Sequence, residues 1–336
     1  MACGAIISSM LSTLTLGELA SPHLPAPIPY AVLTPESHGG AMPLCVLLLG
    51  AGGTRDNLGD LQPLFDRWWD EGAIPPMSIA VPSPGPDYYL EDPAGPLRWD
   101  SFLADDFIPR LRTPGEHTLL AGISGGGYGA LKLAFARPSL FRAVAAMQPM
   151  LEPGLRATDA GPRNRLHHSS GGPPQLIGPS RDSTLWEANN PANRAQANAA
   201  GLQQSNLAIY LEAAARDFLN AHDGAEFLHR LLWDLDLPHE YHLVRDADHG
   251  GPTMRPRLAR MLSWLGALLR PAAVDSAAEE AAKDWLKSGM QGKPPAGATT
   301  TAAYIAFLRS RFQHLRTVTA SMDPNTVRHL GKMPLP

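Results

Sequence analysis

The sequence predicts an α/β fold with a mostly parallel central sheet. Short apolar runs alternate along the chain with longer segments whose apolar residues recur at helical spacing. Several of the short runs are apolar throughout, which is typical of parallel strands covered by helices on both faces. Strands and helices that alternate in this way form a sheet flanked by helices. With 336 residues, 44% of them hydrophobic, the chain is long enough to bury a sizeable core.

Each β-rich run is bounded by turn residues, which is typical of strands. Seven strands are expected, at residues 30–34, 44–50, 77–82, 117–123, 143–148, 206–212 and 240–245. Five helices are expected between or after them, at residues 58–70, 99–112, 127–137, 221–235 and 254–269. The helix over 99–112 is indicated by apolar residues close to helical spacing, and Pro138 marks the end of the helix over 127–137.

Two regions interrupt the alternation. Residues 151–205 are rich in Gly, Pro, Asn, Ser and Arg and predict an irregular, cap-like insertion within a domain that spans residues 1–270. Residues 271–336 predict a helical tail, with helices at 277–288 and 301–317. The apolar side of the second helix makes the tail a candidate surface for a homo-oligomer, although it could instead pack on the core or stay loose.

Charge and composition exclude several classes of partner. The 28 Lys and Arg against 32 Asp and Glu give a net charge of −4, with no basic block, so neither nucleic acid nor a membrane surface is an expected partner. No run approaches the roughly 18 apolar residues of a membrane span. The mildly apolar start has no Lys or Arg before its apolar part, which favours a cytoplasmic protein. Cys3 and Cys45 match no metal or disulfide spacing.

Residues 122–126 spell G-x-S-x-G around Ser124, between an apolar run and a helical pattern. A nucleophile elbow needs this context, because the strand must turn sharply into the helix and expose the serine. The glycines leave room for the close approach of strand and helix, and the amide of Gly125 can face a developing oxyanion. The alternative is a glycine-rich turn that carries an ordinary serine.

A serine hydroxyl needs an adjacent base, which an acid in turn orients. His249 lies in a Gly-rich loop after the last expected strand and before a helix, where the base of such a fold belongs. The segment 151–205 offers His167 and His168 as weaker candidates. Three further histidines fall inside expected strands or helices, namely His222, His229 and His242.

The acid is expected in the loop after the strand over 206–212. Asp217 is well placed there, and Glu212 at the strand end is the alternative. Asp223 is assigned to the following helix, whereas Asp246 and Asp248 lie too near His249 in sequence to orient its ring easily.

A second amide for the oxyanion is expected from the loop after an early strand. Gly50, Ala51, Gly52 and Gly53 follow the buried strand over 44–50. A phosphate-binding loop is the competing interpretation, but the G-x-x-x-x-G-K-[ST] pattern is absent. Gly52 and Trp99 are candidates for the wall of a substrate pocket, and Trp99 could equally pack in the core.

Residues 28–270 resemble the Putative esterase family of α/β-hydrolases, whose relatives include esterase D-type and feruloyl-esterase-type enzymes. The motifs that carry the resemblance include "LLLGAGGTRDNL", "YYLEDPAGPLRWDSFLADDFIPRL", "GISGGGYGALKLAFARPSLF", "LWEANNPAN" and "DADHGG". The resemblance implies an α/β-hydrolase fold and a serine esterase that cleaves a small-molecule ester through an acyl-enzyme, without cofactor or metal. It further implies Ser124 as nucleophile, Asp217 as acid, His249 as base, and Ala51 with Gly125 as amide donors.

The sequence departs from the family pattern at three places. Leu49 stands where relatives often have His, and Gly125 replaces a common Met or Gln after the nucleophile. The residues "AAAR" at 213–216 replace a Gly-containing turn before the acid. An acyltransferase with the same residues and a non-catalytic binding protein are the two alternatives to a hydrolase.

Overall fold

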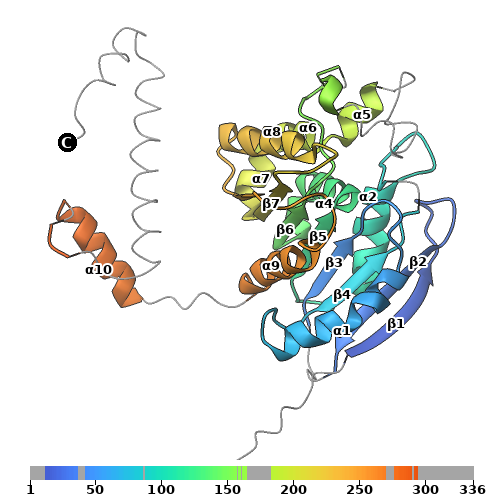
Figure 1. The fold of residues 1–336 in the computed structure, drawn as a ribbon, viewed down its shortest axis with the longest axis horizontal. Helices are drawn as coiled ribbons and strands as arrows, with labels where there is room; N and C mark the ends of the chain where they lie inside the picture. The colour runs from blue at the N-terminus through green and yellow to red at the C-terminus, as the bar shows by residue number, and fades with distance from the viewer. Residues whose placement is uncertain are drawn as a thin grey trace, which may run out of the picture. The chain divides into compact units, whose positions relative to one another are not determined.

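The computed structural model describes residues 12–36, 42–85, 88–156, 158–159, 161–164, 183–269, 276–289 and 291–293. The chain divides into two compact units, residues 1–270 and 271–336. The first unit contains the sheet and its covering helices (Figure 1). The described part of the second unit contains helix α10 (Ser276–Lys287), which agrees with the helix predicted over 277–288. The helix predicted over 301–317 lies outside the described residues.

An eight-stranded sheet forms the centre of the first unit, in the order β1-β2-β4-β3-β5-β6-β7-β8. The six strands from β4 to β8 in this order are parallel, whereas β2 is antiparallel to both of its neighbours, β1 and β4. The strands are β1 (Ser12–Leu19), β2 (Ile28–Pro35), β3 (Leu44–Leu48), β4 (Ser78–Pro82), β5 (Thr118–Ile123), β6 (Ala143–Met147), β7 (Ala208–Ala214) and β8 (Glu240–Val244). All seven predicted strands are confirmed, and the predicted α/β fold is correct.

Strand β1 was not predicted. It pairs along its whole length with β2 at one edge of the sheet, and its residues alternate between half-buried and exposed over most of their length. An edge strand that faces solvent on one side needs few large apolar side chains. The segment contains Thr13, Thr15 and Glu18 and so has no continuous apolar run that would identify it as a strand.

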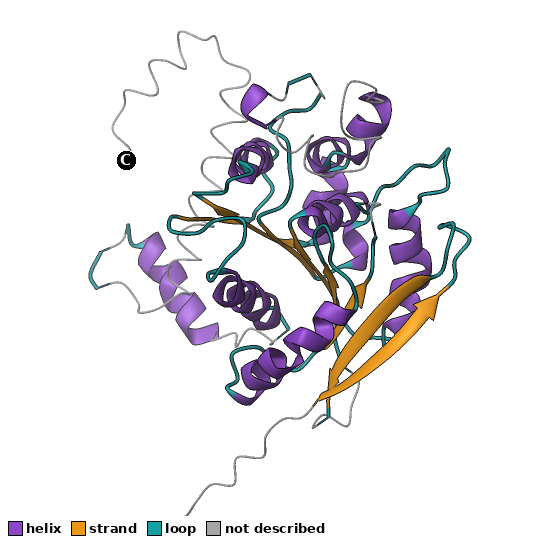
Figure 2. Ribbon diagram, turned by 45° about the vertical axis from the view of Figure 1, so that its right-hand side comes forward, coloured by secondary structure: helices purple, strands orange, loops and turns teal. Residues whose placement is uncertain are grey.

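Helices cover both faces of the sheet (Figure 2). The described helices of this unit are α1 (Asp56–Asp70), α2 (Trp99–Ser101), the π-helix η1 (Phe102–Phe107), α3 (Ile108–Leu111), α4 (Gly125–Ala136), the 3₁₀-helix η2 (Pro138–Leu140), α5 (Ser183–Asn189), α6 (Pro191–Ala197), α7 (Ala199–Ser205), α8 (Ala221–Asp234) and α9 (Met254–Ala267). The five predicted helices are confirmed, with the one over 99–112 made of α2, η1 and α3.

Side chains of β3 show how the two cores form. Val46 packs in the core on the side of α4 and α8, and Cys45 and Leu47 pack in the core with α1 and α9. Successive residues of a strand point to opposite faces, so a strand apolar at every position supplies both cores. Cys45 is fully buried, and this burial raises the pKa of its thiol to about 12.

The expectation of irregular structure over 151–205 is wrong for its second half, where α5, α6 and α7 follow one another. The start of α6 carries a signal that composition hid. The side chain of Asn190 accepts a hydrogen bond from the amide of Ala192 (3.0 Å), and Pro191 occupies the first helical position. Asparagine at the N-cap followed by proline is a favoured helix start.

None of the helices within the described ranges is long and apolar enough to cross a membrane. The cytoplasmic location inferred from the sequence stays a prediction.

Candidate active site

Ser124 lies at the sharp turn between β5 and α4. Its backbone has φ 57° and ψ −122°, a region that residues other than glycine rarely adopt. Neighbouring backbone holds this conformation, because the Ser124 amide donates to the carbonyl of Met147 (3.0 Å) and its carbonyl accepts from the amides of Tyr128 and Met150 (3.1 Å each). Surroundings that fix a strained residue in this way are typical of functional sites.

Two glycines beside the serine are required by close backbone contacts. A Cβ atom on Gly122 would overlap the carbonyl oxygen of Gly126, and a Cβ on Gly126 would overlap that of Leu48. The start of α4 therefore packs directly against β3 and β5. Because of this close packing, Ser124 is presented at the carboxyl end of the sheet, as the G-x-S-x-G pattern predicts.

The structure brings three of the predicted residues into one hydrogen-bonded chain. Ser124 Oγ lies 2.9 Å from His249 Nε2, and His249 Nδ1 lies 2.7 Å from Asp217 Oδ2. An ionised carboxylate only accepts hydrogen bonds, so Nδ1 carries a proton and donates it. The neutral ring then leaves Nε2 free to accept from the serine hydroxyl.

Asp217 is fixed in the turn after β7. Its side chain is fully buried, and its Oδ1 accepts a hydrogen bond from the amide of Leu219 (2.8 Å). The alternative acid, Glu212, lies inside β7 and not at its end. It forms a buried ion pair with Arg257 (2.6 Å) and accepts from the hydroxyl of Tyr210 (2.8 Å). Of the two carboxylates, only Asp217 contacts His249.

Asp248 links the loop that carries Asp217 to the loop that carries His249. The sequence excluded Asp248 as the acid, because it adjoins His249, but did not indicate this linking role. One of its carboxylate oxygens accepts from the amides of His249 (2.6 Å) and Phe218 (3.0 Å). These two backbone hydrogen bonds lower the pKa of Asp248. Phe218 follows Asp217 directly, so one exposed carboxylate ties the two loops together.

Two buried side chains hold the loop of His249 from beneath. Arg257 Nη1 donates to the carbonyl of Asp248 (2.9 Å), and Gln148 Nε2 donates to the carbonyl of His249. Gln148 also has positive φ (41°), and its amide donates to the carbonyl of Glu212 (2.6 Å). No motif in the sequence pointed to Arg257 or Gln148, because tertiary packing and not residue spacing brings each of them to a backbone carbonyl of this loop.

A cleft of about 690 Å³ opens beside Ser124 at the carboxyl ends of the parallel strands, where α/β folds usually bind ligands. Its wall is mainly apolar. The lining residues are Leu49, Gly50, Ala51, Gly53, Asn57, Leu61, Tyr88, Ile123, Ser124, Gln148, Met150, Phe218, Leu219, His249, Gly250, Gly251, Met254, Arg255 and Leu258.

The two predicted amide donors belong to segments that adjoin Ser124. Gly125 follows Ser124 in the chain, and Ala51 follows Gly50, where an added Cβ would overlap the Ser124 side chain. Ala51 lines the cleft with Ser124, in a turn closed by a hydrogen bond from the Gly53 amide to the Gly50 carbonyl (3.0 Å). Gly125 is the first residue of α4, where amides have no partner within the helix. Within the described ranges neither amide donates a hydrogen bond.

A scan against family models matches residues 21–265 to a family described as "Putative esterase". The chain belongs to this esterase family. No curated protein matches the sequence. Family membership supports an enzyme with esterase activity.

Solved structures give the same fold. A ferulic acid esterase matches with a TM-score of 0.60 and 20% identity over 78% of this chain and 100% of its own. FphF, a fluorophosphonate-binding serine hydrolase of Staphylococcus aureus, matches with a TM-score of 0.59 and 18% identity over 78% of this chain and 100% of its own. An S-formylglutathione hydrolase from Agrobacterium tumefaciens matches with a TM-score of 0.59 and 14% identity over 78% and 98%. The esterase thus has an α/β-hydrolase fold.

The prediction that Trp99 borders the substrate pocket of the esterase is wrong. Trp99 is fully buried in the core and packs edge-on against the rings of Tyr89 and Phe102, with ring centroids 5.2 and 5.4 Å away. Its ring belongs to the core on the side of α4 and α8. Gly52 has positive φ (75°) in the loop after β3 and is exposed, but it does not line the cleft, whereas its neighbours Ala51 and Gly53 do.

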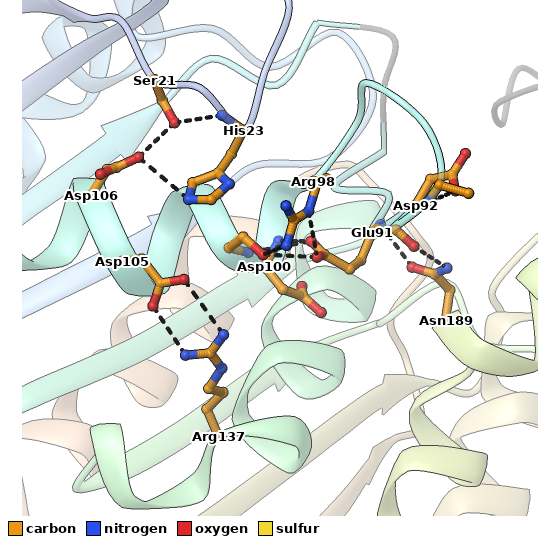
Figure 3. Close-up of polar contacts among 12 residues, drawn as sticks. Ser21, His23, Glu91, Asp92, Arg98, Asp100, Asp105, Asp106, Arg137 and Asn189 are labelled. Carbon is orange, nitrogen blue, oxygen red and sulfur yellow. Dashed lines mark hydrogen bonds and ion pairs between the residues drawn. The ribbon is translucent and has the colours of Figure 1, made fainter.

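A buried polar cluster fixes the segment between Tyr88 in the cleft wall and α2 (Figure 3). One oxygen of Glu91 accepts from the amides of Asp100 (2.7 Å) and Ser101 (3.2 Å), so Glu91 caps the start of α2. The side chain of Asn189 exchanges two hydrogen bonds with the backbone of Glu91 (2.8 and 2.9 Å). The cluster joins α2 to α5, so it is part of the framework behind the cleft.

The other candidate histidines make different contacts. His222 contacts Arg163 and Asp223, and Asp223 lies in the first turn of α8 as expected. His229 pairs with His239, and His242 with Glu240. His167 and His168 lie outside the described residues. Across the described ranges, no three His, Cys, Asp or Glu side chains cluster so as to hold a metal ion.

Proposed function

We propose that this protein is a serine carboxylic-ester hydrolase that acts through an acyl-enzyme. The observation that carries the proposal is the hydrogen-bonded chain from Ser124 through His249 to Asp217, at a strained elbow that borders a cleft. Membership of the esterase family supports the reaction class. The geometry supports the division of roles among the three residues.

In the proposed first half-reaction, Ser124 Oγ attacks the ester carbonyl while His249 Nε2 takes its proton. Asp217 holds the ring in the required tautomer and stabilises the imidazolium that forms. The tetrahedral oxyanion accepts hydrogen bonds from the amides of Ala51 and Gly125. His249 then gives the proton to the leaving alcohol, and the acyl group stays on Ser124.

In the second half-reaction, His249 activates a water molecule that attacks the acyl-enzyme and releases the acid. If an acceptor alcohol or thiol replaced this water, the same residues would perform acyl transfer. The two reactions differ in product, so acid release measured with and without an added alcohol acceptor distinguishes them. Hydrolysis is the proposed reaction.

The test uses Ser124→Ala, with Ser139→Ala as a matched control at an exposed serine outside the cleft. We expect Ser124→Ala to lower kcat on p-nitrophenyl esters by about 10⁶, the cost of losing a triad nucleophile. It should also abolish labelling by a fluorophosphonate probe, while circular dichroism stays unchanged. Retention of most activity, or equal loss in the control, would show that Ser124 is not the nucleophile.

A further inference from the structure

The wall of the cleft beside Ser124 contains cationic side chains but no carboxylate. None of the residues that line it is an aspartate or a glutamate. The groups in the wall that can carry charge near neutral pH are His249 and Arg255, and His249 is engaged with Ser124 and Asp217. Arg255 lies in the first turn of α9 and is exposed to solvent.

The side chain of Arg255 forms no hydrogen bond or ion pair within the described part of the chain. The carboxylates around the cleft are either occupied or do not reach it. Asp248 accepts the two amides of Phe218 and His249. Asp56 and Asp60, on the neighbouring helix α1, form no ion pair with Arg255. Its guanidinium is thus an unpaired cation in the wall of the cleft.

Arg255 differs in burial and in charge pairing from Arg257, which lies two residues further along α9. Arg257 is buried and paired with Glu212, so its charge is neutralised inside the protein. Arg255 is accompanied in the cleft wall by the apolar side chains of Met254 and Leu258 from the same helix. Apolar neighbours lower the local polarity and strengthen the attraction between the guanidinium and an anion.

We propose that Arg255 recognises an anionic group, a carboxylate in the simplest case, on an ester whose remaining part is apolar. This inference rests on the proposed function. The planar guanidinium can bind both oxygens of a carboxylate at once, and the apolar walls take the rest of the substrate. An ester with an acidic group in a comparable position is therefore preferred to its neutral counterpart.

The carboxylate can belong to the acyl part or to the alcohol part of the ester. His249 donates its proton to the alcohol, and the residues that follow it, Gly250 and Gly251, line the same wall as Arg255. Both parts are tested with matched pairs of esters. p-Nitrophenyl hemisuccinate and p-nitrophenyl butyrate differ by a carboxylate on the acyl part, and 4-carboxyphenyl butyrate and phenyl butyrate by one on the alcohol part.

The experiment measures kcat/KM for the four esters with the full-length protein, Arg255→Gln, Arg255→Glu and Arg260→Gln. Arg260 is an exposed arginine on α9 that does not line the cleft. For at least one pair we expect Arg255→Gln to lower the ratio of the anionic to the neutral ester about five- to tenfold. Arg255→Glu should lower this ratio further, and about 0.5 M salt should weaken the preference of the native protein. Arg260→Gln should leave both ratios unchanged. The pair that responds identifies the part of the ester that carries the anion.

Two results would overturn the inference. One is that Arg255→Gln leaves both ratios unchanged, and the other is that Arg260→Gln lowers them as much. In either case hydrolysis of the neutral esters and fluorophosphonate labelling of Ser124 would leave the proposed function intact. Absence of both hydrolysis and labelling in the native protein would instead refute the proposed function itself.

Discussion

Two carboxylates, Asp217 and Glu212, lie five residues apart around the end of β7, and their contacts separate their roles. Asp217 is hydrogen-bonded to His249, whereas Glu212 is buried between Arg257 and Tyr210. The first carboxylate can affect the protonation of the imidazole directly. The second can affect it only through the position of the chain.

We predict that Asp217→Asn lowers kcat on a p-nitrophenyl ester by roughly 10⁴, by analogy with the same change in a serine protease triad. The amide would favour the wrong tautomer of His249 while filling the same volume. The matched control is Glu212→Gln, which should chiefly lower the free energy of unfolding because it leaves Arg257 buried without its counter-charge. If Asp217→Asn kept a nearly normal kcat while Glu212→Gln was folded but inactive, Glu212 and not Asp217 would be the acid.

At the scale of elements, the loop between β8 and α9 depends on partners from three other segments. Arg257 from α9, Gln148 after β6 and the amide of Phe218 after β7 bind Asp248 or His249. The loop has glycine at two of its positions after His249, and backbone of that kind is not rigid by itself. Its position is therefore imposed by these hydrogen bonds.

We predict that Arg257→Met lowers both stability and activity. Removal of one partner of a buried ion pair costs about 3–5 kcal/mol of the free energy of unfolding. The double variant Glu212→Gln/Arg257→Met should recover much of this stability, since no unpaired charge remains and Gln can still accept from Tyr210. It should nevertheless keep a kcat lowered about 10- to 100-fold, because the carbonyl of Asp248 loses its donor. Urea unfolding and kinetics measure the two effects, and full recovery of kcat in the double variant would refute a positioning role for Arg257.

A pair of histidines links α8 to the start of β8. His229 Nδ1 and His239 Nε2 are 2.7 Å apart, and His229 stacks on Tyr241 (4.4 Å between ring centres). Burial lowers the pKa of both histidines, and the charges of His239 and Arg230 add to the effect on His229. The folded state therefore favours the neutral rings.

We predict that this pair makes the protein less stable in mild acid. Above the unfolded pKa of about 6.5 both states are neutral, and the pair contributes no pH dependence. As the pH falls below that value the unfolded chain binds protons first, so the free energy of unfolding decreases until the lowered folded pKa values are passed. Urea midpoints at about pH 7.5 and pH 5.5 measure the decrease. The variant His229→Gln/His239→Gln should show a smaller one, and an unchanged decrease would mean that other groups cause it.

At the scale of the whole molecule, the hydrolase unit contains every group of the proposed site. The family match ends at residue 265, and the first compact unit ends at residue 270. We predict that the truncated chain 1–270 folds and retains kcat/KM on p-nitrophenyl esters within about threefold, because no residue of the site lies beyond α9. Circular dichroism and kinetics check the prediction. A folded truncation without turnover would show that residues 271–336 complete the site.

The sheet and the elbow around Ser124 could be predicted because they depend on local pattern, whereas local pattern left Asp217 and Glu212 as alternatives for the acid. A buried parallel strand is apolar at every position, and an elbow needs glycine at fixed distances from the serine. Features set by tertiary packing could not be predicted in this way. Composition does not tell whether Trp99 faces a cleft or a core, and spacing does not reveal that Arg257 holds a carbonyl of the loop before it. The edge strand β1 lacks the apolar run that identified the others.

The burial of Cys45 makes its thiol a probe of global unfolding. The thiolate is the reactive form of cysteine, and this thiol is both inaccessible and held protonated in a central strand. An alkylating reagent can reach it only when β3 separates from its neighbours β4 and β5, which amounts to loss of the whole sheet. With Cys3 replaced by serine, Cys45 is the one remaining thiol, and its rate of modification reports the frequency of such global openings under native conditions.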